Sequence, residues 1–89
     1  MTHPRYPSDE VVRRGRALYE ERIRAAVEPS HLGKFLALDI ETGEYEIDTD
    51  ELAAAARAQA RNPNAVLYIL RIGYRAAFRI GASFASPRT

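Results

Sequence analysis

The first pattern along the chain has helical spacing. Between residues 8 and 27, apolar side chains recur at nearly helical intervals and charged side chains fill the positions between them. Ser8 stands where an N-cap belongs, and two acidic residues follow it, which favours the positive end of a helix dipole. Because proline disfavours helical backbone in the preceding residue, we expect this amphipathic helix to end before Pro29, with a loop over residues 28–33.

A β-hairpin comes next. Residues 34–41 and 44–48 alternate with the period of two that is typical of strands. Gly43 lies between the two runs and can supply the positive φ of a short hairpin loop. In the first strand the alternation predicts two faces, one with Leu36, Leu38 and Ile40 and the other with Phe35, Ala37 and Asp39.

A second helix is predicted over residues 49–61, which are mostly alanine, the best helix former. Asp48 or Thr49 can cap it, and Glu51 stands where a capping box requires an acidic residue. We expect its sheet-facing side to carry Leu52, Ala56, Gln59 and Ala60. Residues 65–72 then form a strand that is apolar on both faces, which indicates a central place in a sheet.

This order of elements predicts an α+β fold, in which an N-terminal amphipathic helix precedes a ββαβ unit. The simplest topology places the third strand beside the first, in a three-stranded, mostly antiparallel sheet of order 2-1-3 with a right-handed crossover. The alanine-rich helix covers one face of that sheet. The other face, with Phe35, Ala37, Leu67 and Ile69, needs a cover, and both the N-terminal helix and a second copy of the chain remain candidates.

With 89 residues the chain can bury one core, so we expect a single domain over residues 8–81. Residues 1–7 are expected to be a flexible arm and residues 82–89 a tail, while the stretch from Gly73 onward is left open between an extra strand, a helical turn and a tail. The chain has no cysteine, which excludes disulfides and thiol chemistry, and it has no apolar run of membrane-spanning length. We therefore expect a cytoplasmic protein.

Charge is distributed unevenly along the chain. All acidic residues lie between Asp9 and Glu51, so residues 1–51 carry a net charge of −5 and residues 52–89 carry +6. Two interpretations are open: a basic binding surface in the second half, or mutual neutralisation of the two halves in the fold.

Residues with catalytic or metal-binding chemistry are few. His31 follows Ser30 directly, but sequence adjacency does not make a nucleophile–base pair with a third orienting group. The carboxylates around the hairpin lack the spacing of a calcium loop, and no glycine-rich phosphate loop is present. The sequence thus predicts no enzyme, no cofactor and no metal site.

One stretch resembles a known family. Residues 19–24 read YEERIR and residues 27–35 read VEPSHLGKF, a pattern similar to small bacterial proteins of unknown function from cyanobacteria and planctomycetes. The resemblance covers residues 10–81, and its hairpin–helix–strand part also resembles an antitoxin-like domain. It implies a small partner protein of a two-gene module, either an antitoxin or the companion of another small protein, and carries no catalytic residues.

Two surfaces are candidate contact sites. The first is the edge strand with Tyr45 and Ile47, because a free strand edge is a template for β-augmentation. The second is the basic and aromatic C-terminal segment, with Arg71, Arg75, Phe78, Arg79, Ile80 and Phe84. We expect a protein partner, with self-association as a further possibility. The alternative is a nucleic-acid-binding regulator that uses the arginines and aromatic rings of the second surface.

Overall fold

The computed structural model describes residues 6–74 and 78–80. In chain order the helices are α1 (Ser8–Leu18), the π-helical turn η1 (Tyr19–Ile23), α2 (Arg24–His31) and α3 (Glu51–Arg61). The strands are β1 (Phe35–Asp39), β2 (Tyr45–Asp48), β3 (Leu67–Arg71) and β4 (Phe78–Ile80).

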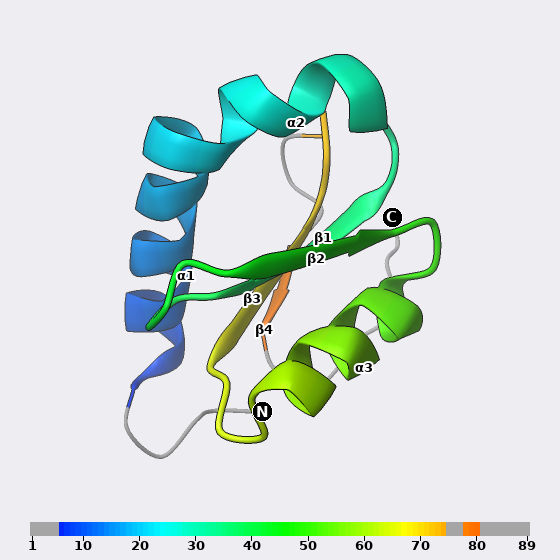
Figure 1. Cartoon of the computed structure of the whole chain (residues 1–89). Helices are drawn as coiled ribbons and strands as arrows, with labels where there is room; N and C mark the ends of the chain where they lie inside the picture. Colours follow the sequence, from blue (N-terminus) through cyan, green and yellow to red (C-terminus); the bar gives the residue numbers. More distant parts are fainter. Residues whose placement is uncertain (1–5, 75–77, 81–89) are drawn as a thin grey trace.

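The strands form one sheet in the order β2-β1-β3-β4, and all neighbouring strands are antiparallel (Figure 1). The predicted α+β fold and the strand order 2-1-3 are confirmed. β4 adds a fourth strand beside β3, so residues 78–80 of the segment left open in the sequence are a strand. Residues 81–89, which include the predicted tail, lie outside the described residues.

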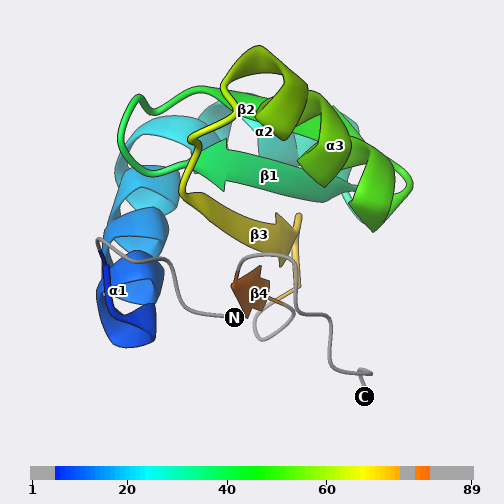
Figure 2. The ribbon, with the colours of Figure 1, turned by 90° about the horizontal axis from the view of Figure 1, so that it is seen from below.

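Helices lie on both faces of the sheet, with α1, η1 and α2 on one side and α3 on the other (Figures 1 and 2). The larger core cluster lies under the N-terminal helical elements and contains Val11, Tyr19, Ile23, Val27, Leu36, Leu38, Ile40, Val66, Tyr68, Leu70 and Ile72. The smaller cluster lies under α3 and contains Ala37, Ala54, Ala58, Ala65, Leu67 and Ile69.

The assignment of the sheet faces made from the sequence is wrong. α3 covers the face with Ala37 and Ile69, which was predicted to need another cover, and the N-terminal helix covers the face with Leu36 and Leu38. Volume explains the arrangement, since the alanines of α3 fit closely against Ala37, whereas larger side chains fill the opposite layer. Both faces are therefore covered without a second copy of the chain.

α3 also presents a different side from the one predicted. Ala54 and Ala58 face the sheet, whereas Leu52 is 60% exposed. In a helix made largely of alanine, several faces can pack against a sheet, and contact with β1 and β3 decides among them. The helix begins two residues later than expected, at Glu51. Asp50, and not Asp48 or Thr49, is the N-cap, and its carboxylate accepts a hydrogen bond from the Ala53 N–H at 3.2 Å.

The N-terminal helix continues beyond its predicted end at residue 27. It contains Pro29 and ends at His31, so residues 28–31 are helical and not part of a loop. Pro29 lacks the N–H that would bond to the carbonyl of Ala25, and because Ala25 is exposed, water can satisfy that carbonyl. Gly33, with a φ of 85°, turns the chain into β1. The beginning also differs slightly, because Pro7 and not Ser8 is the N-cap.

The π turn has a simple geometric reason. The buried positions of the long helix are 11, 15, 19, 23 and 27, a constant spacing of four. Four residues of α-helix turn by about 40° more than one full turn. Over the four steps from position 11 to position 27, the line of buried side chains would therefore rotate by about 160° away from the sheet. In η1 the Arg24 N–H bonds to the Tyr19 carbonyl, five residues back, and this wider turn takes back part of the drift.

Gly15 lets α1 lie directly on β3. A Cβ at this position would lie 2.6 Å from the Cβ of Tyr68, closer than atoms in contact can come. In the sequence Gly15 only weakens the helix, whereas in the structure it makes room for an aromatic ring.

The hairpin turn has the predicted positive φ at Gly43, 81°, and its N–H donates to the Asp39 carbonyl at 2.8 Å. Asp39 is the buried acidic residue of the core, and its carboxylate accepts from the Glu41 N–H at 3.0 Å and from the Asn62 amide at 3.1 Å. Both carboxylate oxygens are therefore used to join the hairpin turn to the end of α3. Tyr6, predicted to be part of a flexible arm, donates to Glu41 at 3.1 Å and packs against the larger core cluster.

Candidate functional site: an aromatic corner and a charged cleft

The turn after α2 meets the end of β3 at one corner of the molecule. The Gly33 N–H donates to the Ile72 carbonyl at 2.9 Å, and the Ile72 N–H donates to the Lys34 carbonyl at 2.8 Å. Gly73 turns the chain away with a φ of 88°, and a Cβ there would lie 2.6 Å from Leu32. The two chain segments are thus held side by side by backbone hydrogen bonds.

Arg71 lies at the centre of this corner. Its Nε donates to the Gly33 carbonyl at 3.0 Å. The centre of its guanidinium lies 4.2 Å from the centroid of the Tyr74 ring and 5.5 Å from that of Phe35. We use "the corner" for Leu32, Phe35, Arg71, Gly73 and Tyr74.

The corner exposes apolar surface. Leu32 is 66% exposed and Tyr74 is 54% exposed. Among the described residues, the only other large hydrophobic side chain that is exposed is Leu52 on α3. Single exposed apolar residues are ordinary, but here Leu32 lies beside Gly73 and Tyr74 stacks on Arg71, so two exposed apolar side chains belong to one corner.

A cleft of about 130 Å³ adjoins the corner, between the N-terminal helix and the end of β3. On the helix, four residues at a spacing of four form its charged wall: Arg16, Glu20, Arg24 and Glu28. The buried residues Tyr19, Tyr68 and Leu70 also line it, and the corner contributes Arg71, Gly73 and Tyr74.

Arg24 is paired on both sides along the helical wall. Its Nη1 lies 2.8 Å from Glu20 and its Nε lies 3.0 Å from Glu28, and these two partners raise the pKa of Arg24 above its usual value. The Tyr19 hydroxyl donates to Glu28 at 3.4 Å. Burial, together with the nearby Glu28 charge, raises the pKa of Tyr19 to about 12, so its phenol stays protonated.

The other buried phenol, Tyr68, responds to two opposed effects. Burial raises its pKa, and a hydrogen bond with Arg16 partly lowers it. The cleft therefore contains neutral phenols and an Arg24 paired with two glutamates. It also contains Arg16, which hydrogen-bonds with a phenol, and Arg71, which donates to a backbone carbonyl.

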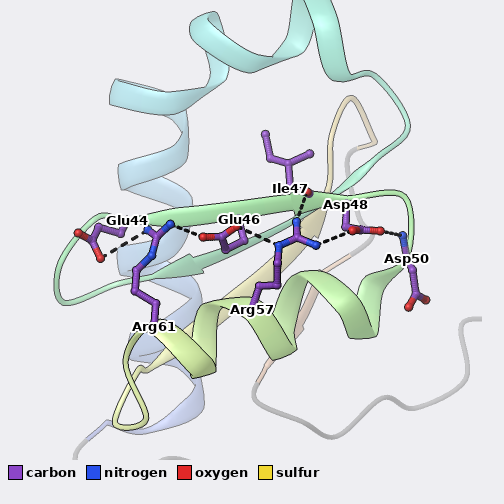
Figure 3. Close-up of polar contacts among 7 residues, drawn as sticks. All are labelled: Glu44, Glu46, Ile47, Asp48, Asp50, Arg57 and Arg61. Atoms are coloured by element: carbon purple, nitrogen blue, oxygen red, sulfur yellow. Dashed lines mark hydrogen bonds and ion pairs between the residues drawn. The ribbon is translucent and has the colours of Figure 1, made fainter.

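On the opposite side of the sheet, α3 neutralises the acidic hairpin (Figure 3). Arg57 lies 3.2 Å from Glu46 and 2.6 Å from Asp48, and Arg61 pairs with Glu46 and, at 3.6 Å, with Glu44. The Arg57 guanidinium, followed by the Asp50 N–H, lowers the pKa of Asp48. Of the two interpretations of the charge distribution, mutual neutralisation describes these two arginines.

Arg57 also occupies part of the free backbone edge of β2. The Asp39 N–H donates to the Glu44 carbonyl, so by the alternation of antiparallel ladders the backbone groups of Tyr45 and Ile47 point away from β1. The Ile47 carbonyl accepts from Arg57 at 2.6 Å. The side chains of Tyr45 and Ile47 pack against the larger core cluster. β-augmentation at this edge stays a prediction.

The remaining predicted contact residues have different outcomes. Arg71 belongs to the corner. Phe78, Arg79 and Ile80 form β4, whose backbone alone is described. Arg75 and Phe84 lie outside the described residues. Sequence reasoning missed Leu32 and Phe35 as neighbours of Arg71, because the hydrogen bonds that join them to β3 span nearly forty residues of chain.

No metal centre takes shape in the described part of the chain. His31 lies at the end of α2 with its Nδ1 3.3 Å from the Lys34 ammonium. Among residues 6–74 and 78–80, no group of three histidine or acidic side chains converges to hold a metal ion. No helix within these ranges is both long and apolar enough to span a membrane.

Comparison of the chain with protein-family models, with curated proteins and with solved structures returned no match. The resemblance to antitoxin-like proteins therefore stays a prediction from residues 10–81.

Proposed function

We propose that this chain is a non-enzymatic protein-interaction module and that the corner is its contact surface. The observation that supports this proposal is the exposure of Leu32, which lies beside Gly73, and of Tyr74, which stacks on Arg71. Burying these side chains against a partner would remove apolar surface from water, which is favourable at about 25 cal/mol per Å².

The residue types fit an interface. Tyrosine and arginine are enriched among the residues that dominate binding energies, and they act best when a partner excludes water from them. Arg71 is already held by the Gly33 carbonyl and two rings, so binding would cost little of its conformational freedom. The corner is thus pre-organised before a partner arrives.

The partner class follows from the resemblance alone. An antitoxin-like protein of a two-gene module binds the second protein of that module. We therefore propose the product of a neighbouring gene as the first partner to test.

Nucleic-acid binding is the alternative, and the charge pairing weighs against it. Arg57 and Arg61 pair with the hairpin, and Arg13, Arg14 and Arg24 pair with glutamates of the N-terminal helix. An arginine that is already paired with a carboxylate must give up that partner to neutralise a phosphate, which reduces the gain from counterion release.

The test is affinity capture from native cells, with chemical crosslinking and mass spectrometry after nuclease treatment. Wild type is compared with the double variant Leu32→Ala/Tyr74→Ala, and Leu52→Ala is the matched control because it removes an exposed leucine from α3. We expect a stoichiometric protein partner that wild type and the control retain and that the double variant loses, with crosslinks at the corner.

Retention of every partner by a folded double variant would contradict the proposal. A partner that is lost on nuclease treatment, and whose binding weakens steeply with added salt, would instead favour the nucleic-acid alternative. Circular dichroism of each variant checks that the fold is kept.

A further inference from the structure

We propose that the charged cleft beside the corner binds a carboxylate group carried by the partner, with Arg71 as the principal anchor. The inference rests on the proposed function, since a partner seated on the corner would place an acidic side chain or its C-terminus at the mouth of the cleft. The cleft and the corner share Arg71, Gly73 and Tyr74.

Arg71 has donors available for such a group. Its Nε is used by the Gly33 carbonyl, and among the described residues no carboxylate forms an ion pair with it. The two Nη atoms therefore remain as a planar pair of donors, which matches the two oxygens of a carboxylate. The Tyr74 and Phe35 rings hold the guanidinium in place.

The opposite wall offers further donors. Arg16 contacts the neutral Tyr68, so it can also hydrogen-bond an incoming anion. Arg24 contributes less, because Glu20 and Glu28 already use its Nη1 and its Nε.

The net charge of the cleft selects the kind of anion. Its described lining carries three arginines and two glutamates, a net formal charge of +1. A monoanion neutralises this charge, whereas a phosphate dianion would exceed it beside Glu20 and Glu28. The volume of about 130 Å³ corresponds to roughly four water molecules, enough for a carboxyl group and its link to a larger molecule.

The probe is acetate, titrated into ¹⁵N-labelled full-length protein and followed by NMR, with inorganic phosphate titrated separately. We expect saturable shifts of the amides of Gly33 and residues 70–74 with acetate, and weaker binding of phosphate. Arg71→Gln should weaken acetate binding about tenfold or more, because it removes the charge-assisted hydrogen bonds. Arg16→Gln, on the exposed wall of the helix, should weaken it by a smaller factor.

The control is Arg61→Gln, which removes an arginine from α3 on the far side of the sheet and should leave acetate binding unchanged. The proposal is overturned if wild type shows no saturable shifts, if Arg71→Gln or Arg16→Gln binds as tightly as wild type, or if phosphate binds more tightly than acetate. Because the probe needs no partner, a cleft that binds acetate while capture finds no protein would refute only the proposed function. A partner lost by the corner variant while acetate fails to bind would refute only the carboxylate site.

Discussion

The two sides of the sheet are built by opposite means. On the side of α1, η1 and α2, large side chains fill a thick layer. The buried residues of this long helix are spaced by four, and the π turn helps to keep them facing the sheet. On the side of α3, alanines bring the helix close to the sheet, and Arg57 and Arg61 tie it to β2 (Figure 3).

The two sides also differ in the space left between helix and sheet. On the α3 side, the polar groups between helix and strand are matched by ion pairs, and the cavity between Ala58 and β2 has a volume of only about 10 Å³. On the other side, the long helix and the end of β3 leave the cleft between them. Among the described residues, the cleft therefore lies on the side with large side chains, and the proposed carboxylate site lies there.

The largest expected effect is loss of volume on the side with large residues. Leu38 is fully buried, so Leu38→Ala should lower the free energy of unfolding by about 2–5 kcal/mol. Leu52→Ala removes the same atoms from an exposed position and should change it by about 0.5 kcal/mol or less. Urea denaturation measures both. Equal losses would mean that Leu52 packs in the core, as its spacing in the sequence predicted.

On the α3 side the damaging change is added volume. Ala54 is fully buried against the sheet, and Ala54→Leu should destabilise by about 1–3 kcal/mol because the close helix–sheet contact must open. Ala56→Leu, at an exposed position of the same helix, is the control and should be nearly neutral. Thermal unfolding followed by circular dichroism is sufficient. Tolerance of leucine at position 54 would contradict the close packing described here.

Gly15 tests the contact between α1 and β3. In an isolated helix, Gly→Ala stabilises by about 1 kcal/mol, but here the new Cβ would overlap the Tyr68 ring. Gly15→Ala should therefore lower the free energy of unfolding, by about 1–3 kcal/mol. Ala17→Gly, at an exposed position of α1, isolates the propensity effect. A more stable Gly15→Ala protein would show that the helix does not lie on Tyr68.

The smallest expected effect is electrostatic. Hydrogen bonds from Arg13 and Arg14 lower the pKa of Glu10 from 4.5 to about 2. Because the folded-state pKa is the lower one, the contribution is present above about pH 4.5 and is lost as the pH falls to about 2. Glu10→Gln should make stability slightly less dependent on pH in this window, most visibly at low salt.

Denaturation at several pH values measures that slope, and Glu21→Gln, an exposed residue of the π turn, is the matched control. A slope that is equally steep with and without Glu10 would place the acid sensitivity elsewhere, for example at Asp48, whose pKa is also lowered.

Local patterns identified most elements, but not β4, the π turn or the ends of the helices. Alternation identified the hairpin and Gly43 as its turn residue, because side-chain period and positive φ are properties of a few neighbouring residues. The helix end at His31 was missed, because the cost of Pro29 depends on whether water can reach one carbonyl. The π turn was missed for a related reason, since a sheet must be present before the helix needs to follow it.

The candidate site was found only in part. The sequence indicated Arg71 as a contact residue beside an aromatic ring, but Leu32 and Phe35 join it through hydrogen bonds that connect the α2–β1 turn to the end of β3. Likewise, the split in charge was visible in the sequence, whereas the pairing of Arg57 and Arg61 with the hairpin depends on where α3 lies.

The sequence by itself determined the two long helices, the first three strands, their order along the chain and the strand order 2-1-3, since period and chain connectivity restrict these directly. Only the tertiary structure decided which helix covers which face, which side of α3 is buried, and which residues meet at the corner. The physical reason is that an alanine-rich helix and a two-sided apolar strand have several acceptable local arrangements. The volumes and charges of distant segments select among them.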